Sequence, residues 1–271
     1  MENIIKIYSQ KSKLEIIEEH DDGLKVGNGK RIIADIIFKE SKSSPVIIVP
    51  GMNTSENGKR KILRKLRFLK DRILIFYNIP KLTLNEKDND FFNFMKRSVS
   101  EIRGIIDFSQ KNYKFEKVNI IGISLGGIIS TIVSAVDDRI EKIILFASGG
   151  DFENITWRGL LRFVLKKDCS RKACHNLHKT YKKLLKYNLY DEIMELPRKC
   201  FLYDPILFAN SIKKKVLMIN GFFDTVIPFF SAMELKKRIE NAEIIWYPAT
   251  HLSLSIFSPF FKKKILEFLK N

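Results

Sequence analysis

The chain has 271 residues, of which 45% are hydrophobic, and a formal net charge of +17. This length and composition suit one large α/β domain, or a core domain with an insertion, and support a sizeable core. No apolar stretch reaches membrane-spanning length, the first residues lack a signal-peptide pattern, and the three cysteines form no disulfide framework, so we expect a cytoplasmic protein.

The first forty residues predict short strands over residues 3–8, 13–19 and 31–38, with glycine-containing turns between them. From residue 45 the pattern changes to alternating strands and helices, which is typical of an α/β fold with a parallel sheet. The later strands are predicted at 46–49, 73–77, 118–123, 143–146, 216–220 and 244–247, and the helices at 58–70, 91–111, 125–136 and 259–270.

A helical and basic segment, residues 151–213, interrupts this alternation. We therefore predict a core domain formed by residues 1–150 and 214–271, with residues 151–213 inserted as a helical cap. The cap would lie over the carboxyl edge of the sheet, where open α/β sheets bind their ligands.

The sequence Gly122-Ile123-Ser124-Leu125-Gly126 follows a predicted strand and precedes a predicted helix. Strand, sharp turn and helix form the setting of a nucleophile elbow, in which a serine hydroxyl stands exposed at the end of the strand. Glycine at positions 122 and 126 lets the strand and the helix approach each other closely. The pattern predicts Ser124 as a nucleophile, and a coincidental glycine-rich turn is the alternative interpretation.

A serine nucleophile needs a base that accepts its proton. Four histidines are available: His20 lies near an acidic turn, and His175 and His178 lie in the basic insertion. His251 directly follows the last predicted strand, at the same sheet edge as Ser124. We therefore predict His251 as the base.

The base in turn needs an acid that orients it. Asp224 and Asp151 each follow a predicted strand and reach the same edge. We favour Asp224, because it ends the strand nearer to His251 in sequence and completes the order serine, acid, histidine. Asp151 is the second candidate.

Together these motifs resemble the α/β-hydrolase superfamily, in its esterase/lipase-like form with a cap, over nearly the whole chain. The residues that carry the resemblance are Gly122 to Gly126, Asn220 to Asp224 with Val226-Ile227-Pro228, and Trp246 to His251. It implies a mostly parallel, eight-stranded sheet flanked by helices.

The resemblance also implies an oxyanion hole formed by the backbone amides of Leu125 and Met52. The chain departs from many family members at Pro50, where they carry histidine. Proline keeps the turn but has no amide hydrogen, so the Met52 amide is still available as a donor.

These inferences predict a serine hydrolase that cleaves a carboxylic ester, or a thioester, through an acyl-enzyme on Ser124, with no metal or organic cofactor. A peptidase or amidase with the same triad is one alternative. A ligand-binding protein of the same fold without turnover is another.

The positive charge lies in two segments. Residues 59–72 contain eight Lys or Arg and one acid, and residues 155–215 contain fifteen and five, whereas the remainder is balanced. We expect this charge to attract a small acyl substrate with negative groups, or an anionic membrane surface that the amphipathic stretch Trp157 to Lys167 would contact. Solvated helix faces, and a cap helix over the pocket, are the alternatives. Nucleic acid is disfavoured, because the chain has no recognised nucleic-acid-binding fold, and the sequence leaves the oligomeric state open.

Two cysteines and two histidines close together in the insertion suggest a zinc site. Cys174 and His178 are four residues apart, and Cys169 and His175 lie nearby. Adjacent Cys174 and His175 would point in different directions on a helix, and the chain has no regular C-x-x-C pair. We therefore expect no metal ligands here.

Overall fold

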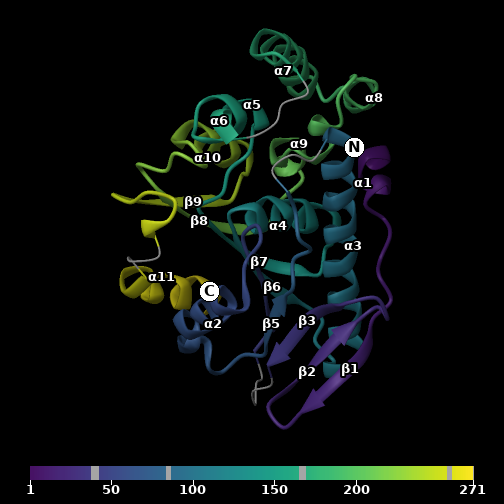
Figure 1. The fold of residues 1–271 in the computed structure, drawn as a ribbon, viewed down its shortest axis with the longest axis vertical. Coiled ribbons are helices and arrows are strands. Elements are labelled where there is room, and N and C mark those ends of the chain that lie inside the picture. Colours follow the sequence, from purple (N-terminus) through teal and green to yellow (C-terminus); the bar gives the residue numbers. More distant parts are fainter. Residues whose placement is uncertain (38–42, 84–86, 165–168, 255–257, 271) are drawn as a thin grey trace.

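The computed structural model describes residues 1–37, 43–83, 87–164, 169–254 and 258–270. These residues contain nine strands: β1 (Glu15–His20), β2 (Gly23–Gly27), β3 (Ile32–Ile37), β4 (Val46–Val49), β5 (Leu74–Tyr77), β6 (Val118–Ile123), β7 (Ile140–Phe146), β8 (Lys215–Gly221) and β9 (Ala242–Tyr247). They form one sheet in the order β1-β2-β3-β5-β4-β6-β7-β8-β9 (Figure 1).

The sheet is antiparallel at its first edge and parallel elsewhere. Strands β1, β2, β3 and β5 pair antiparallel, and β5, β4, β6, β7, β8 and β9 pair parallel. This arrangement confirms the expected α/β class, with nine strands instead of the implied eight. The prediction of a strand at residues 3–8 is wrong, because this segment forms the helix α1 (Glu2–Ile7). Ile4 and Tyr8 are both buried and four residues apart, which is a helical spacing.

Helices cover both faces of the sheet. The remaining helices of the core are α2 (Glu56–Lys65), the 3-10 turn η1 (Arg67–Leu69), α3 (Asp88–Tyr113), α4 (Leu125–Val136), α10 (Phe229–Arg238) and α11 (Ser258–Lys270). Apolar side chains of α2, η1 and α11 pack on one face of the sheet, and those of α1, α3, α4 and α10 pack on the other. Buried isoleucines and valines of the central strands fill both layers.

The segment between β7 and β8 is helical, and in Figure 1 much of it lies beyond one end of the sheet. It contains α5 (Phe152–Trp157), α6 (Leu161–Val164), α7 (Arg171–Lys186), α8 (Tyr190–Met194), the 3-10 turn η2 (Lys199–Tyr203) and α9 (Pro205–Ala209). Side chains of α5, α7, α8, η2 and α9 belong to the same apolar cluster as α3 and α4. The segment therefore shares a continuous core with one face of the sheet.

The amphipathic stretch expected over residues 157–167 is divided into α5 and α6. Gly159 lies between them, and a Cβ atom there would stand 2.2 Å from the Thr225 carbonyl oxygen. Leu160, an apolar residue of this stretch, is exposed. Residues 165–167 of this stretch lie outside the described residues.

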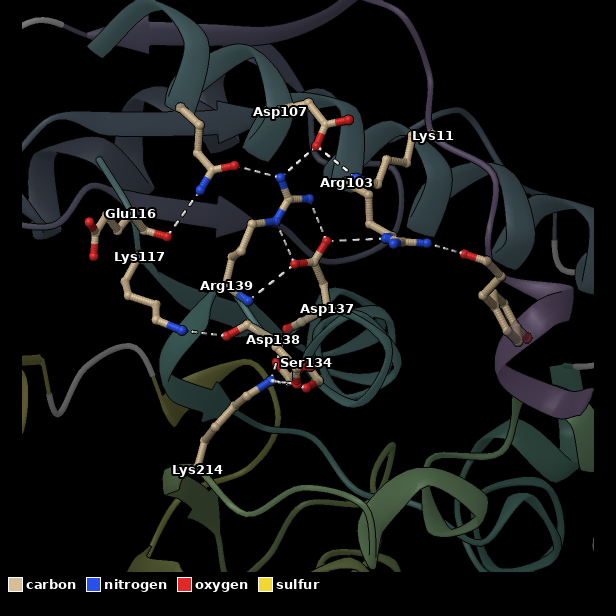
Figure 2. Close-up of polar contacts among 12 residues, drawn as sticks. Lys11, Arg103, Asp107, Glu116, Lys117, Ser134, Asp137, Asp138, Arg139 and Lys214 are labelled. Carbon is tan, nitrogen blue, oxygen red and sulfur yellow. Dashed lines mark hydrogen bonds and ion pairs between the residues drawn. The ribbon is translucent and has the colours of Figure 1, made fainter. Parts of the chain in front are cut away.

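A network of ion pairs joins elements at the end of α4 that is remote from Ser124 (Figure 2). Asp137 accepts hydrogen bonds from Arg139 and Arg103, and Arg139 also contacts Asp107. Burial alone would raise the pKa of Asp137, but the hydrogen bonds and charge of Arg139 outweigh burial and hold this pKa below its usual value. The Arg103 guanidinium also donates to the Tyr8 carbonyl at 2.6 Å, so the network ties α3 to the residue that ends α1.

Candidate active site

Ser124 is the single residue between β6 and α4, and its backbone has a conformation that non-glycine residues rarely adopt. Its φ is 54° and its ψ is −120°. A Cβ atom at Gly122 would lie 2.6 Å from the Gly127 Cα, and one at Gly126 would lie 2.1 Å from the Val49 carbonyl oxygen. The two glycines therefore allow the close strand–helix approach that the sequence predicted. Backbone strain of this kind costs about 1–3 kcal/mol and is held in place by the surrounding structure.

Ser124, His251 and Asp224 form a continuous chain of hydrogen bonds. His251 Nε2 lies 3.0 Å from Ser124 Oγ, and His251 Nδ1 lies 2.7 Å from Asp224 Oδ2. The Asp224 side chain is fully buried, whereas 15% of the His251 side chain is exposed. The amides of Val226 and Ile227 both donate to Asp224 Oδ1 at 2.8 Å, which fixes the carboxylate.

The loops after β8 and β9 bring Asp224 and His251 together. The Phe222 amide donates to the Tyr247 carbonyl at 2.7 Å, and the Phe223 amide donates to the Ala249 carbonyl at 3.0 Å. These bonds continue the pairing of the two parallel strands past their ends. The acid and the base therefore meet because their strands are neighbours in the sheet.

Asp151, the second candidate acid, lies in a different environment. It is 1% exposed, and its carboxylate contacts Lys182 at 2.7 Å and Asn154 at 2.6 Å. Among the described residues, the carboxylate that contacts His251 is Asp224.

The two predicted oxyanion donors belong to segments next to Ser124. Leu125 is the first residue of α4, and the first amides of a helix have no acceptor within the helix. Met52 lies in the loop after β4, where a Cβ atom on neighbouring Gly51 would be 3.5 Å from the Ser124 Cβ. Asn53, which has a φ of 53°, exchanges two hydrogen bonds with the Leu82 backbone and so braces this loop. No pattern in the sequence indicates this bracing role.

A pocket of about 240 Å³ opens beside Ser124, and it is lined mainly by apolar side chains. Helices of the segment between β7 and β8 supply one wall, and α3 and α4 contribute others. The apolar lining residues include Phe91, Leu125, Ile128, Phe152, Ile155, Leu161, Leu177, Phe201, Val226 and Ile227. Arg198 also lines the pocket and pairs with Asp88 at 3.3 Å.

The cysteines and histidines of the segment between β7 and β8 do not share one site. Cys169, Cys174 and Cys200 are free thiols that line the pocket. His175 is exposed and lies 2.6 Å from Glu153. His178 instead faces two aspartates, Asp151 and Asp204, and the three residues are buried together. Sequence reasoning did not find this group, although the pair Asp204-Pro205 has the form of a helix start.

Burial shifts the ionisation of this second group. It lowers the pKa of His178 to about 4, which leaves the imidazole neutral at neutral pH. Burial, followed by the charge of Asp151, raises the pKa of Asp204 to about 7. The pKa of Asp151 is also raised by burial, against the opposing effect of Lys182.

Comparison with solved structures identifies the fold. The esterase Pf2001 from Pyrococcus furiosus is 18% identical, with a TM-score of 0.61 over 98% of this chain and 94% of that one. The acetyl xylan esterase from Paenibacillus sp. R4 is 12% identical, with a TM-score of 0.65 over 99% of this chain and 92% of that one. At such low identity these similarities show the fold alone, and the chain has the α/β-hydrolase fold.

Comparison of sequences does not identify a family for the chain. No protein-family model matches the chain. The α subunit of the acetyl-coenzyme A carboxylase carboxyl transferase from Clostridium perfringens is 26% identical over 241 residues, which cover 80% of this chain and 81% of that protein. This identity is too low to show a common family.

Proposed function

We propose that the protein is a serine hydrolase that cleaves carboxylic esters. The observation that carries this proposal is the hydrogen-bonded chain from Ser124 through His251 to Asp224. It combines a nucleophile, a base and an orienting acid at the carboxyl edge of an α/β-hydrolase sheet. The esterases of similar fold favour esters as the substrate class. The similarity to the carboxyl transferase subunit gives no support to this proposal, because the activity named for that protein does not imply a serine, histidine and aspartate triad.

In the first half of the proposed reaction, Ser124 Oγ attacks the ester carbonyl carbon while His251 Nε2 accepts the hydroxyl proton. The Asp224 carboxylate keeps the Nδ1 proton of His251 in place and stabilises the imidazolium that forms. The amides of Leu125 and Met52 would donate to the developing oxyanion. Removal of one such donor typically costs about 3–4 kcal/mol of transition-state stabilisation.

The tetrahedral intermediate then collapses, the bond to the leaving oxygen breaks, and His251 donates its proton to that oxygen. The acyl group remains on Ser124. A water molecule attacks this acyl-enzyme, His251 accepts a proton from the water, and the acid product leaves as the proton returns to Ser124 Oγ. The separation of 3.0 Å between Ser124 Oγ and His251 Nε2 supports the proton transfers between these two atoms.

The pocket beside Ser124 supports an apolar acyl group. Its volume of about 240 Å³ is below the range of about 300–1,000 Å³ that is common for sites of drug-sized ligands. A short or medium acyl chain fits this space, with its carbonyl at Ser124. A thioester fits the same geometry. Peptidase or amidase activity is the alternative, since an amine is a poorer leaving group and makes a stricter demand on His251 as acid.

A panel of chromogenic esters with graded acyl length tests this proposal. We expect kcat/KM to be highest for short or medium chains and to fall for long ones. Ser124→Ala should lose turnover of every ester, whereas Ser44→Ala should retain it, because Ser44 precedes the amino end of β4 and Ser124 follows the carboxyl end of the parallel strand β6. Faster cleavage of a matched anilide than of the ester would favour the amidase alternative. Unchanged turnover by Ser124→Ala would contradict the proposal.

A further inference from the structure

A second group of polar side chains lies against the pocket wall, around His178. Asp151 follows β7, His178 belongs to α7, and Asp204 precedes α9, so three separate segments meet here. Each residue is at most 2% exposed, and one ligand atom from each lies within 4.8 Å of the other two. We call Asp151, His178 and Asp204 the His178 cluster.

Among the described residues, two atoms of the His178 cluster have no hydrogen-bond partner. They are Asp151 Oδ1 and His178 Nδ1, both buried. They lie 3.7 Å apart, which is longer than a hydrogen bond of about 2.7–3.2 Å. The other carboxylate oxygen of Asp151 already accepts from Asn154 and Lys182. A buried polar atom without a partner costs about 1–3 kcal/mol, so a ligand that satisfies both atoms would be stabilising.

Three carboxylates, those of Asp151, Glu153 and Asp204, surround the cluster against one contacting ammonium, that of Lys182, and this excess of negative groups favours a cation. Asp151 and neighbouring Glu153 both contact the Lys182 ammonium, at 2.7 and 3.1 Å. Asp204 adds a third carboxylate, whose described contacts are the backbone amides of Asp151, Phe152 and Ile206. A carboxylate has about four lone-pair sites, so these three bonds leave Asp204 able to accept one more partner.

We propose that Asp151, His178 and Asp204 bind a divalent transition-metal cation such as Zn²⁺, which joins α7 to the sheet. Zinc bonds to nitrogen and carboxylate oxygen are about 2.0–2.2 Å long, so neighbouring ligands of a tetrahedral ion are roughly 3.4 Å apart. The separation of 3.7 Å between Asp151 Oδ1 and His178 Nδ1 is close to this value. The wider separations, up to 4.8 Å, require the cluster to contract around the ion.

Three protein ligands leave a fourth position for water or a ligand atom. His178 itself is one of the residues that line the pocket beside Ser124. The ion would therefore fix the wall that α7 contributes to the acyl pocket. Binding of the ion does not depend on chemistry at Ser124.

The nearby thiols are a weaker metal site than the His178 cluster. Cys174 precedes His178 by one helical turn, and burial raises the pKa of its thiol to about 12. Burial also raises the pKa of Cys200 well above its usual value. Zinc binds the thiolate, so these thiols must lose a proton that their surroundings retain.

Calorimetric titration of the chelator-treated, tag-free chain with Zn²⁺ and Mn²⁺ tests the proposal, with metal content measured by mass spectrometry. We expect about one equivalent of Zn²⁺ to bind and to raise the melting temperature. Asp151→Asn and His178→Gln should each weaken binding by at least about 10-fold, the loss that even outer-shell changes produce at zinc sites. Glu153→Gln is the matched control, because Glu153 contacts Lys182 but lies outside the cluster.

A second variant separates the cluster from the thiols. Replacement of Cys169, Cys174 and Cys200 by serine should preserve zinc binding, and Co²⁺ bound to the wild type should lack the thiolate charge-transfer band. Ser124→Ala should bind zinc like the wild type, so failure of the esterase proposal would leave this result unaffected. Absence of stoichiometric binding to the wild type, or loss of binding in the serine variant, would overturn the proposal even if the cluster variants fail to fold.

Discussion

Ser124, His251 and Asp224 are held by backbone groups as well as by one another. The serine occupies a strained turn, and the aspartate uses one oxygen for two amides and the other for the histidine. Both oxygens of the Asp224 carboxylate are therefore held, one by the backbone and the other by His251. The sequence could predict these three residues because each directly follows a recognisable strand.

Replacement of the acid provides a prediction at this scale. Asp224→Asn should lower kcat for a good ester substrate by about 10⁴-fold, because the amide disturbs the tautomer and the charge support of His251. Asp151→Asn should lower kcat far less, because Asp151 contacts Lys182 instead of His251. Steady-state kinetics on variants whose circular dichroism spectra match the wild type would distinguish the two candidate acids. The reverse ranking would assign the acid to Asp151.

Other residues of the site could not be predicted. Asp204 follows the 3-10 turn η2 instead of a strand, so the strand pattern of the sequence does not predict where it lies. Its meeting with Asp151 and His178 depends on how α7 and α9 pack, which one sequence does not specify. Pocket residues such as Phe201 and Leu177 cannot be distinguished in the sequence from the many other apolar residues. Their place in the pocket also depends on how the helices pack.

Most elements of the fold were predicted from their periodicity. The helix α4 agrees with its expected bounds, and the central strands agree within a few residues. The failures occur where glycine or a short amphipathic segment has two interpretations. Gly23 and Gly27 suggested turns, yet they bound β2, where Cβ atoms would meet the carbonyl oxygens of Ile36 and Arg31 at 2.2 and 2.4 Å. These contacts arise where β2 pairs with β3, and the local sequence pattern does not reveal this pairing.

The junction of β6 and α4 gives a prediction at the scale of elements. Gly122→Ala should destabilise the protein by about 1–3 kcal/mol, because its Cβ would lie 2.5 Å from Ser130 Oγ and 2.6 Å from the Gly127 Cα. Gly58→Ala is the control: Gly58 lies in the first turn of α2, and its nearest neighbour would be the Thr54 methyl at 3.1 Å. Alanine there should be neutral or stabilise by up to about 1 kcal/mol. Urea unfolding measures both values, and equal effects would contradict this view of the junction.

The charge of the whole molecule is not concentrated inside the pocket. Arg60, Lys61, Arg64, Arg67 and Lys70 line a separate groove at α2 and η1. Among the described pocket residues, the one Lys or Arg is Arg198, which pairs with Asp88. The apolar lining therefore favours an uncharged acyl group over an anionic one. No helix among the described residues has the length and apolar character required to cross a bilayer.

An exposed patch close to Asp224 is better suited than the pocket to contact an anionic lipid surface. We define the rim patch as Arg158, Leu160, Phe163, Phe222, Phe223 and Phe230, all exposed. The Arg158 guanidinium stacks over the Phe230 ring at 4.7 Å, and the Leu160 amide donates to the Thr225 carbonyl at 2.7 Å. Aromatic side chains beside arginine are typical of surfaces that rest on anionic membranes.

We therefore expect the protein to sediment with vesicles that contain phosphatidylserine more than with neutral ones. The difference should shrink as salt rises, since the Debye length is about 10 Å at 0.1 M. The double change Arg158→Ser and Phe163→Ser should weaken binding, whereas Ile16→Ser should not, because Ile16 is exposed on β1 at the other edge of the sheet. Equal binding to both vesicle types would remove the lipid surface as a partner.

Covalent labelling by a fluorophosphonate, followed by peptide mass spectrometry, tests the central claim most directly. The reagent phosphonylates a serine whose proton is removed by a neighbouring base. We predict one adduct per chain, on Ser124, with no labelling of Ser124→Ala and slow labelling of His251→Ala. An adduct on another serine, or full ester turnover in a wild-type protein that takes up no label, would contradict the assignment of Ser124 as the nucleophile.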